Sequence, residues 1–82
     1  MKTIIMAINV GNRNEAVPEV QELLTKYGCI IKTRLGIHTA GDNCSRKGLI
    51  ILELSSEDIK DIEELEKGLK QIETVSSNKM EI

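Results

Sequence analysis

The residues best suited to metal chemistry lie in one polar segment. His38, Asp42 and Cys44 follow one another closely there. Imidazole, carboxylate and thiolate groups are ligands that transition metals such as Ni, Zn or Fe accept. One chain falls short of a four-ligand set, but a two-fold axis near the segment would combine two His and two Cys. The alternative is a polar loop with a solvent-exposed His and a half-buried thiol.

A second candidate site is a turn rich in polar residues, where Asn9 is followed by Gly11, Asn12 and Arg13. This turn precedes a predicted helix, and free backbone N–H groups at a helix N-terminus favour an anion such as a ligand carboxylate. The Arg13 guanidinium could hold such a group through two hydrogen bonds. The alternative is a turn that only caps the helix. The residues therefore predict either an effector site or a structural turn.

The composition argues against catalysis and against nucleic-acid binding. The chain has one His, which leaves little room for a nucleophile and base pair, and it has no phosphate loop or dinucleotide fingerprint. Its formal net charge is −2, its Lys and Arg residues are dispersed, and Tyr27 is its one aromatic residue. Nucleic-acid partners require clustered positive charge and stacking platforms. We expect a non-enzymatic protein with no direct nucleic-acid partner.

Hydrophobic periodicity indicates the elements that carry these groups. It predicts strands over residues 3–10, 29–35, 49–54 and 74–82. It also predicts two helices: the first follows the polar turn and ends near Tyr27, and the second covers residues 56–72. Asn14 is expected to cap the first helix and Gly28 to end it, whereas Ser55 or Ser56 is expected to cap the second. The mixed polarity of the strand over 29–35 favours a sheet edge, and the apolar strand over 49–54 favours the centre.

This order of elements predicts one α+β domain over residues 1–82 with a ferredoxin-like βαββαβ fold. A four-stranded antiparallel sheet would carry both helices on one face. The central strands are apolar on both faces, so Ile5, Ala7, Leu49 and Ile51 would lie on the face without helices. We expect these residues to form the interface of a homo-oligomer, a dimer or a tetramer. The alternative is that the segment 36–48 folds over them.

The chain shows no signal for a membrane or for export. No apolar run reaches the ~20 residues that cross a bilayer. The apolar start at residues 1–8 meets the polar Asn9 with no small-residue cleavage site, which indicates a strand rather than a signal peptide. Cys29 and Cys44 are too few for a disulfide framework. We therefore expect a cytoplasmic protein.

Several segments together carry a family resemblance over nearly the whole chain. They are Val20-Gln21-Glu22-Leu23-Leu24, Tyr27-Gly28, Ile31-Lys32-Thr33-Arg34-Leu35-Gly36-Ile37, Gly48-Leu49-Ile50-Ile51-Leu52-Glu53-Leu54 and Leu65-Glu66-Lys67-Gly68-Leu69. In these segments the chain resembles small ACT-like proteins regarded as regulators of the iron-only hydrogenase system. The resemblance implies an ACT-like fold, homo-oligomers and a regulatory role. ACT domains typically bind small effectors, often amino acids, at subunit interfaces.

A weaker similarity is to the metal-binding domain of nickel-responsive repressors, which shares the fold. There a His and a Cys with the spacing of His38 and Cys44 lead into the third strand. Three hypotheses follow. The chain could be a regulatory oligomer that binds a small effector or a hydrogenase-system protein, a metal sensor or metal-delivery module that uses His38 and Cys44, or a purely structural interaction domain.

Overall fold

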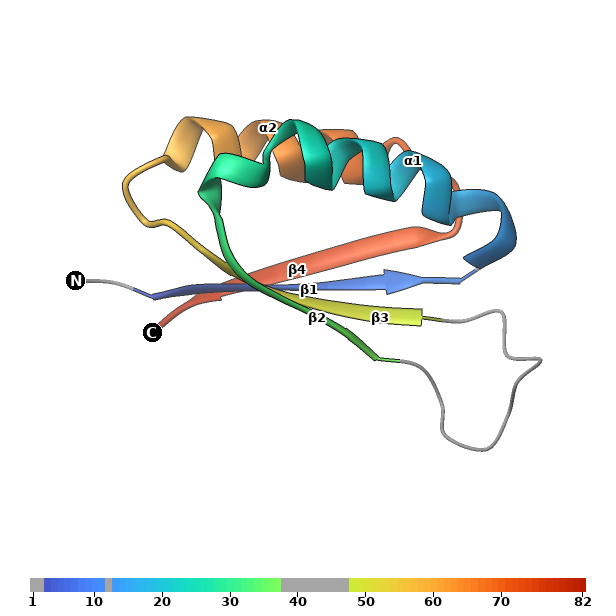
Figure 1. The fold of residues 1–82 in the computed structure, drawn as a ribbon, viewed down its shortest axis with the longest axis horizontal. Helices are drawn as coiled ribbons and strands as arrows, with labels where there is room; N and C mark the ends of the chain where they lie inside the picture. The colour runs from blue at the N-terminus through green and yellow to red at the C-terminus, as the bar shows by residue number, and fades with distance from the viewer. Residues whose placement is uncertain (1–2, 12, 38–47) are drawn as a thin grey trace.

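The computed structural model of the chain describes residues 3–11, 13–37 and 48–82. The elements follow one another as predicted (Figure 1). They are β1 (Ile4–Val10), α1 (Arg13–Lys26), a 3-10 turn (Gly28–Ile30), β2 (Ile31–Ile37), β3 (Gly48–Leu54), α2 (Ile59–Lys70) and β4 (Val75–Glu81).

The four strands form one antiparallel sheet in the order β2-β3-β1-β4. Both helices lie on the same side of this sheet (Figure 1). The predicted ferredoxin-like βαββαβ fold is thus confirmed, and so are the edge position of β2 and the central position of β3. Because the helices form a single layer, the other side of the sheet has no helix against it.

The core lies between the helices and the sheet. In β1 every second residue from Ile4 to Val10 is buried, since alternate strand side chains point to the helix side. The helices contribute stripes at helical spacing, Ala16, Val20 and Leu24 from α1 and Ile62, Leu65 and Leu69 from α2. No polar side chain is buried among the described residues. Neither described helix has the length and apolar character needed to cross a membrane.

The predicted caps of α1 were wrong at both termini, although the helix ends at Lys26, next to the predicted Tyr27. The helix begins at Arg13, so Asn14 lies inside it and does not occupy the N-cap position. At the other end Gly28 does not adopt a left-handed φ, and it begins the 3-10 turn instead. The turn uses residues that we expected in the second strand, so β2 begins at Ile31. These ends follow from how the chain must enter the sheet, which local residue preferences do not specify.

The start of α2 also differs from the prediction. It begins at Ile59, and Asp58 occupies the N-cap position without a side-chain hydrogen bond, so neither Ser55 nor Ser56 is the cap. The Asp58 backbone N–H instead approaches the Ser55 carbonyl at 3.4 Å, and the Ile62 N–H donates to the Asp58 carbonyl at 3.0 Å. A short turn thus separates β3 from α2.

Gly11 makes a close backbone contact at the end of β1. Its N–H donates to the Thr74 carbonyl at 2.7 Å. A Cβ atom at Gly11 would lie 2.9 Å from that same carbonyl oxygen and 3.2 Å from the Thr74 Cβ. Thr74 has a φ of 67°, a left-handed conformation that is rare for a β-branched residue. Because the nearest atom is a backbone oxygen and not the end of a flexible side chain, a Cβ at this position would force the backbone to shift, which favours glycine.

We expect Gly11→Ala to lower the free energy of unfolding by about 1–3 kcal/mol, because the added methyl group overlaps backbone atoms. Gly36→Ala is the matched control, since a Cβ at Gly36 would have no neighbour within 4 Å. Urea unfolding of both variants and the wild type would measure the difference. Equal stability of the two variants would contradict the steric argument.

Candidate functional site

The candidate site is the side of the sheet opposite the helices, which we call the open face. The strand registers place its residues in rows that run across the strands. In order these rows are Thr33, Glu53, Ile5 and Met80, then Leu35, Ile51, Ala7 and Asn78, then Leu49, Asn9 and Ser76. Glu53 is the one charged residue among these positions.

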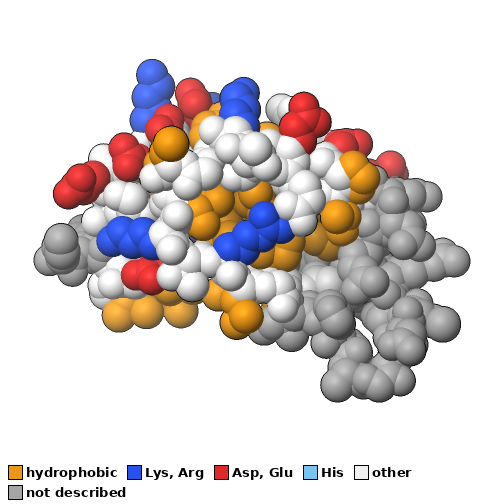
Figure 2. Space-filling model, viewed as in Figure 1, with side chains coloured by type: hydrophobic (Ala, Val, Ile, Leu, Met, Phe, Trp, Pro, Cys, Tyr) orange, Lys and Arg blue, Asp and Glu red, His pale blue; other side chains and the backbone are white. Residues whose placement is uncertain are grey.

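An apolar band crosses the open face. The predicted interface residues Ile5, Ala7, Leu49 and Ile51 all lie on it and are partly exposed, and Ala7 pairs directly with Ile51. At the two edge strands Leu35 is 54% exposed and Met80 is 57% exposed. Figure 2 shows hydrophobic side chains along the lower edge of the molecule, away from the helices, and acidic side chains mainly over the helix layer. The placement agrees with an interface, which itself stays a prediction.

The small side chain of Ala7 leaves a hollow in the open face. The hollow has a volume of about 230 Å³ and is lined by Ile5, Ala7, Asn78, Lys79 and Met80. It lies over the paired strands β1 and β4 and is open to solvent. A hollow of this kind in an apolar surface can receive a side chain from a second molecule.

Polar groups flank the apolar band on its two sides. On one side the Thr33 hydroxyl lies 3.3 Å from Glu53 Oε1 and donates to it across the β2–β3 pair. On the other side lie Asn9, Ser76 and Asn78, which we call the polar corner. The open face therefore has hydrogen-bond acceptors with a negative charge on one side and amide and hydroxyl groups on the other.

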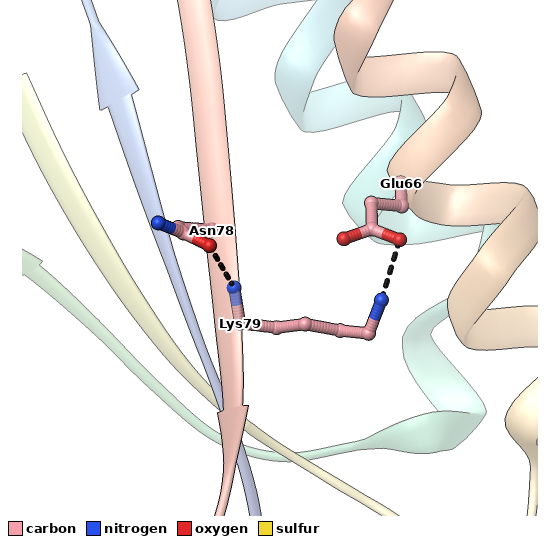
Figure 3. Close-up of polar contacts among 3 residues, drawn as sticks. All are labelled: Glu66, Asn78 and Lys79. Atoms are coloured by element: carbon pink, nitrogen blue, oxygen red, sulfur yellow. Dashed lines mark hydrogen bonds and ion pairs between the residues drawn. The ribbon is translucent and has the colours of Figure 1, made fainter.

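Asn78 and Lys79 project to opposite sides of the edge strand β4 (Figure 3). The Lys79 ammonium lies 2.6 Å from Glu66 Oε1 on α2, and this ion pair joins the edge strand to the helix layer. The Asn78 Oδ1 accepts a hydrogen bond from the Lys79 backbone N–H at 3.2 Å. The Asn78 amide nitrogen points away from that contact, so its donors are available on the open face.

The predicted effector residues are brought together only in part. Asn9 is exposed on the open face next to Ser76. The Gly11 N–H is already used by the Thr74 carbonyl, so it cannot also bind an anion. Arg13 begins α1, but its side chain, like Asn12, lies outside the described residues. Of the predicted effector groups, the Asn9 side chain is therefore exposed to a ligand, whereas the Gly11 backbone N–H is not free to bind one.

The predicted metal ligands His38, Asp42 and Cys44 lie outside the described residues. Within residues 3–11, 13–37 and 48–82 no group of three His, Cys, Asp or Glu side chains could hold a metal ion. The Ni, Zn or Fe site therefore stays a prediction. Elemental analysis of the wild type and of a His38→Ala/Cys44→Ser variant would test it.

A second hollow, of about 360 Å³, lies between α1 and α2. Its rim includes Glu19, Glu22 and Lys26, and its floor includes Leu23 and Gly68. A Cβ at Gly68 would lie 2.9 Å from a methyl carbon of Leu23, so glycine allows the two helices to approach closely. The charges around this hollow are of both signs, which suits a solvated groove between packed helices.

Sequence reasoning missed six residues of the open face: Thr33, Leu35, Glu53, Ser76, Asn78 and Met80. The alternation of side chains along β2 and β4 could have assigned Leu35 and Met80, because residues two apart share a face. The positions of Glu53 and Asn78 relative to the band depend on the strand registers. No local pattern carries that information.

No family model and no curated protein matches this sequence. Among solved structures, an uncharacterized protein from Thermotoga maritima is similar, with a TM-score of 0.75 and 26% identity over 100% of this chain and 99% of that one. A nitrogen regulatory PII-like protein from Thiomonas intermedia, bound to ADP, AMP and bicarbonate, has a TM-score of 0.59 and 13% identity over 100% and 91%. A dimeric ferredoxin-like protein from an uncultured marine organism has a TM-score of 0.53 and 9% identity over 99% and 92%.

Proposed function

We propose that this chain is a non-enzymatic regulatory domain that assembles into a homo-oligomer through its open face and binds a small effector beside that interface. The apolar band is the observation that carries the proposal. Leu35 and Met80 are more than half exposed on it, and Ile5 and Ile51 lie between them. A protein gains free energy by covering such a band, at roughly 25 cal/mol for each Å² of apolar surface removed from water.

A second copy of the chain could cover the apolar band without any other kind of molecule. Similarity of fold to a protein that is itself dimeric supports this part of the proposal. The other half, effector binding, is supported by the polar corner, where Asn9 and Ser76 lie next to the band. An effector at this corner would contact the rim of the interface, so its binding would be linked to assembly. The fold is also that of a regulatory protein solved with small ligands.

The resemblance to regulators of the iron-only hydrogenase system supplies the regulated process in this proposal. It covers β2, β3 and both helices, where Arg34, Leu35 and Gly36 follow the Tyr27-Gly28 helix end. On this view the domain responds to a small molecule and acts on a component of that system.

We expect Leu35→Glu to weaken self-association roughly tenfold or more, because a carboxylate would be buried in an apolar interface. Ile59→Glu is the matched control: Ile59 is 47% exposed, similar to Leu35, but it begins α2 in the helix layer. Light scattering over a dilution series would measure the mass of each protein. If both variants and the wild type have the same mass at every concentration, the open face is not the interface.

For the effector, we expect at least one compound from a panel of the twenty amino acids, ADP, AMP and bicarbonate to raise the melting temperature of the wild type. Asn9→Ala should remove that rise, because it deletes the amide at the polar corner. Gln71→Ala removes an exposed amide at the end of α2 and should keep the rise. A panel in which no compound raises the melting temperature would contradict this part and favour a structural interaction domain.

For the regulated process, we expect deletion of the gene to change iron-only hydrogenase activity in cell extracts. Expression of the wild type or of Ile59→Glu should restore the original activity, and Leu35→Glu should not. Unchanged hydrogenase activity after deletion would contradict a role of this chain in the iron-only hydrogenase system.

A further inference from the structure

We propose that two copies pack open face to open face across a two-fold axis that runs along the apolar band, so that Glu53 of each copy meets Asn78 of the other. This inference rests on the proposed function, because it requires the homo-oligomer. It adds the direction of the symmetry axis and the polar contact that sets this direction.

The band runs diagonally across the sheet. It begins at Leu35 and Leu49 on β2 and β3, passes Ile51 and Ile5, and ends at Met80 on β4. With strands about 4.8 Å apart and residues rising about 3.4 Å along each strand, this path makes an angle of roughly 45° with the strands. If a two-fold axis runs along the band, the strands of one sheet would cross the strands of the other at about twice this angle. The result is close to the near-perpendicular class of sheet packing.

Rotation about this axis exchanges the two sides of the band. Thr33 and Glu53 lie on one side, and Asn78, Asn9 and Ser76 lie on the other. The apolar residues of one copy therefore cover the apolar residues of the second. At the same time the Glu53 side of each copy faces the polar corner of its partner. The surface is self-complementary about this axis, as an isologous interface must be.

The axis perpendicular to the band gives a different outcome. Rotation about this axis would also place apolar residues against apolar residues. Each polar group, however, would face the same polar group of the partner. The two Glu53 carboxylates would then face each other in a region that excludes water. Like charges in that arrangement are unfavourable. The charge distribution of the open face thus favours the axis along the band.

The groups that would meet have hydrogen-bonding capacity to spare. The Asn78 oxygen accepts from the Lys79 backbone, and its amide nitrogen makes no hydrogen bond to another described residue, so two N–H donors remain. Glu53 accepts from Thr33 through Oε1, which leaves Oε2 as an acceptor. Packed sheets lie about 10 Å apart, a distance that a glutamate and an asparagine side chain together can largely span.

The hollow at Ala7 provides room for this contact. Its lining includes Asn78, and it lies on the same side of the band as the polar corner. The Glu53 side chain of the partner subunit would enter it, with its methylene groups against Ile5 and Ala7 and its carboxylate at the Asn78 amide. A small residue at position 7 is what makes the two faces fit.

The test is a charge exchange measured through the dimer dissociation constant. Asn78→Asp should weaken the dimer about tenfold or more, because each of the two symmetric contacts would join two carboxylates. Adding Glu53→Lys should restore affinity to near the wild-type value, because a Lys would then face an Asp. Glu63→Lys has the same change in net charge but lies on α2, so Glu63→Lys/Asn78→Asp should stay weak. Light scattering of dilution series at low salt gives each constant.

The outcomes separate this inference from the proposed function. A wild type that stays monomeric at high concentration would overturn both. A wild-type dimer that Leu35→Glu dissociates, but whose Asn78→Asp variant is unaffected or is not rescued by Glu53→Lys, would retain the open-face interface and overturn the axis. A stable trimer would overturn the two-fold axis as well. Rescue by Glu53→Lys and not by Glu63→Lys supports the proposed contact.

Discussion

Two helices can cover only one side of a four-stranded sheet, and this limit shapes the whole molecule. The central strands β1 and β3 are apolar on both sides, but only Ile4, Met6, Ile8 and the other helix-facing residues are fully buried. The opposite side retains Leu35 and Met80 in solvent. The described strands are joined into one sheet, but one side of that sheet keeps apolar surface in water, and a second molecule can cover that surface.

The edge strand β4 contributes both to the packing of the single chain and to its open face. Lys79 forms an ion pair with Glu66 of α2, so one side chain of β4 contacts the helix layer. Its neighbour Asn78 projects to the open face and offers amide donors there. Alternation along one strand thus places one side chain at the helix layer and its neighbour on the open face. A ligand beside this strand would act on a surface that the proposed partner also contacts.

Sequence reasoning predicted the element types and most of their bounds well, and it predicted the helix caps poorly. The stripes of α1 and α2 and the alternation of β1 are set by burial, which repeats over many residues and overrides local preference. The ends depend on single positions. Asn14 has a suitable side chain for a cap, yet α1 starts before it, and Gly28 has the freedom for a left-handed turn that the chain does not use. The candidate interface was found because Ile5, Ala7, Leu49 and Ile51 belong to the repeating pattern.

The amino-acid sequence by itself determined that the sheet has an apolar side without helices, because side-chain alternation and helical spacing are properties of the linear chain. Tertiary structure alone decided which residues lie side by side on that surface. Ala7 lies between Ile51 and Asn78, and Glu53 lies between Thr33 and Ile5, because strands distant in the sequence pair in particular registers. Register arises from the packing of the whole sheet against its helices, so no single segment encodes it.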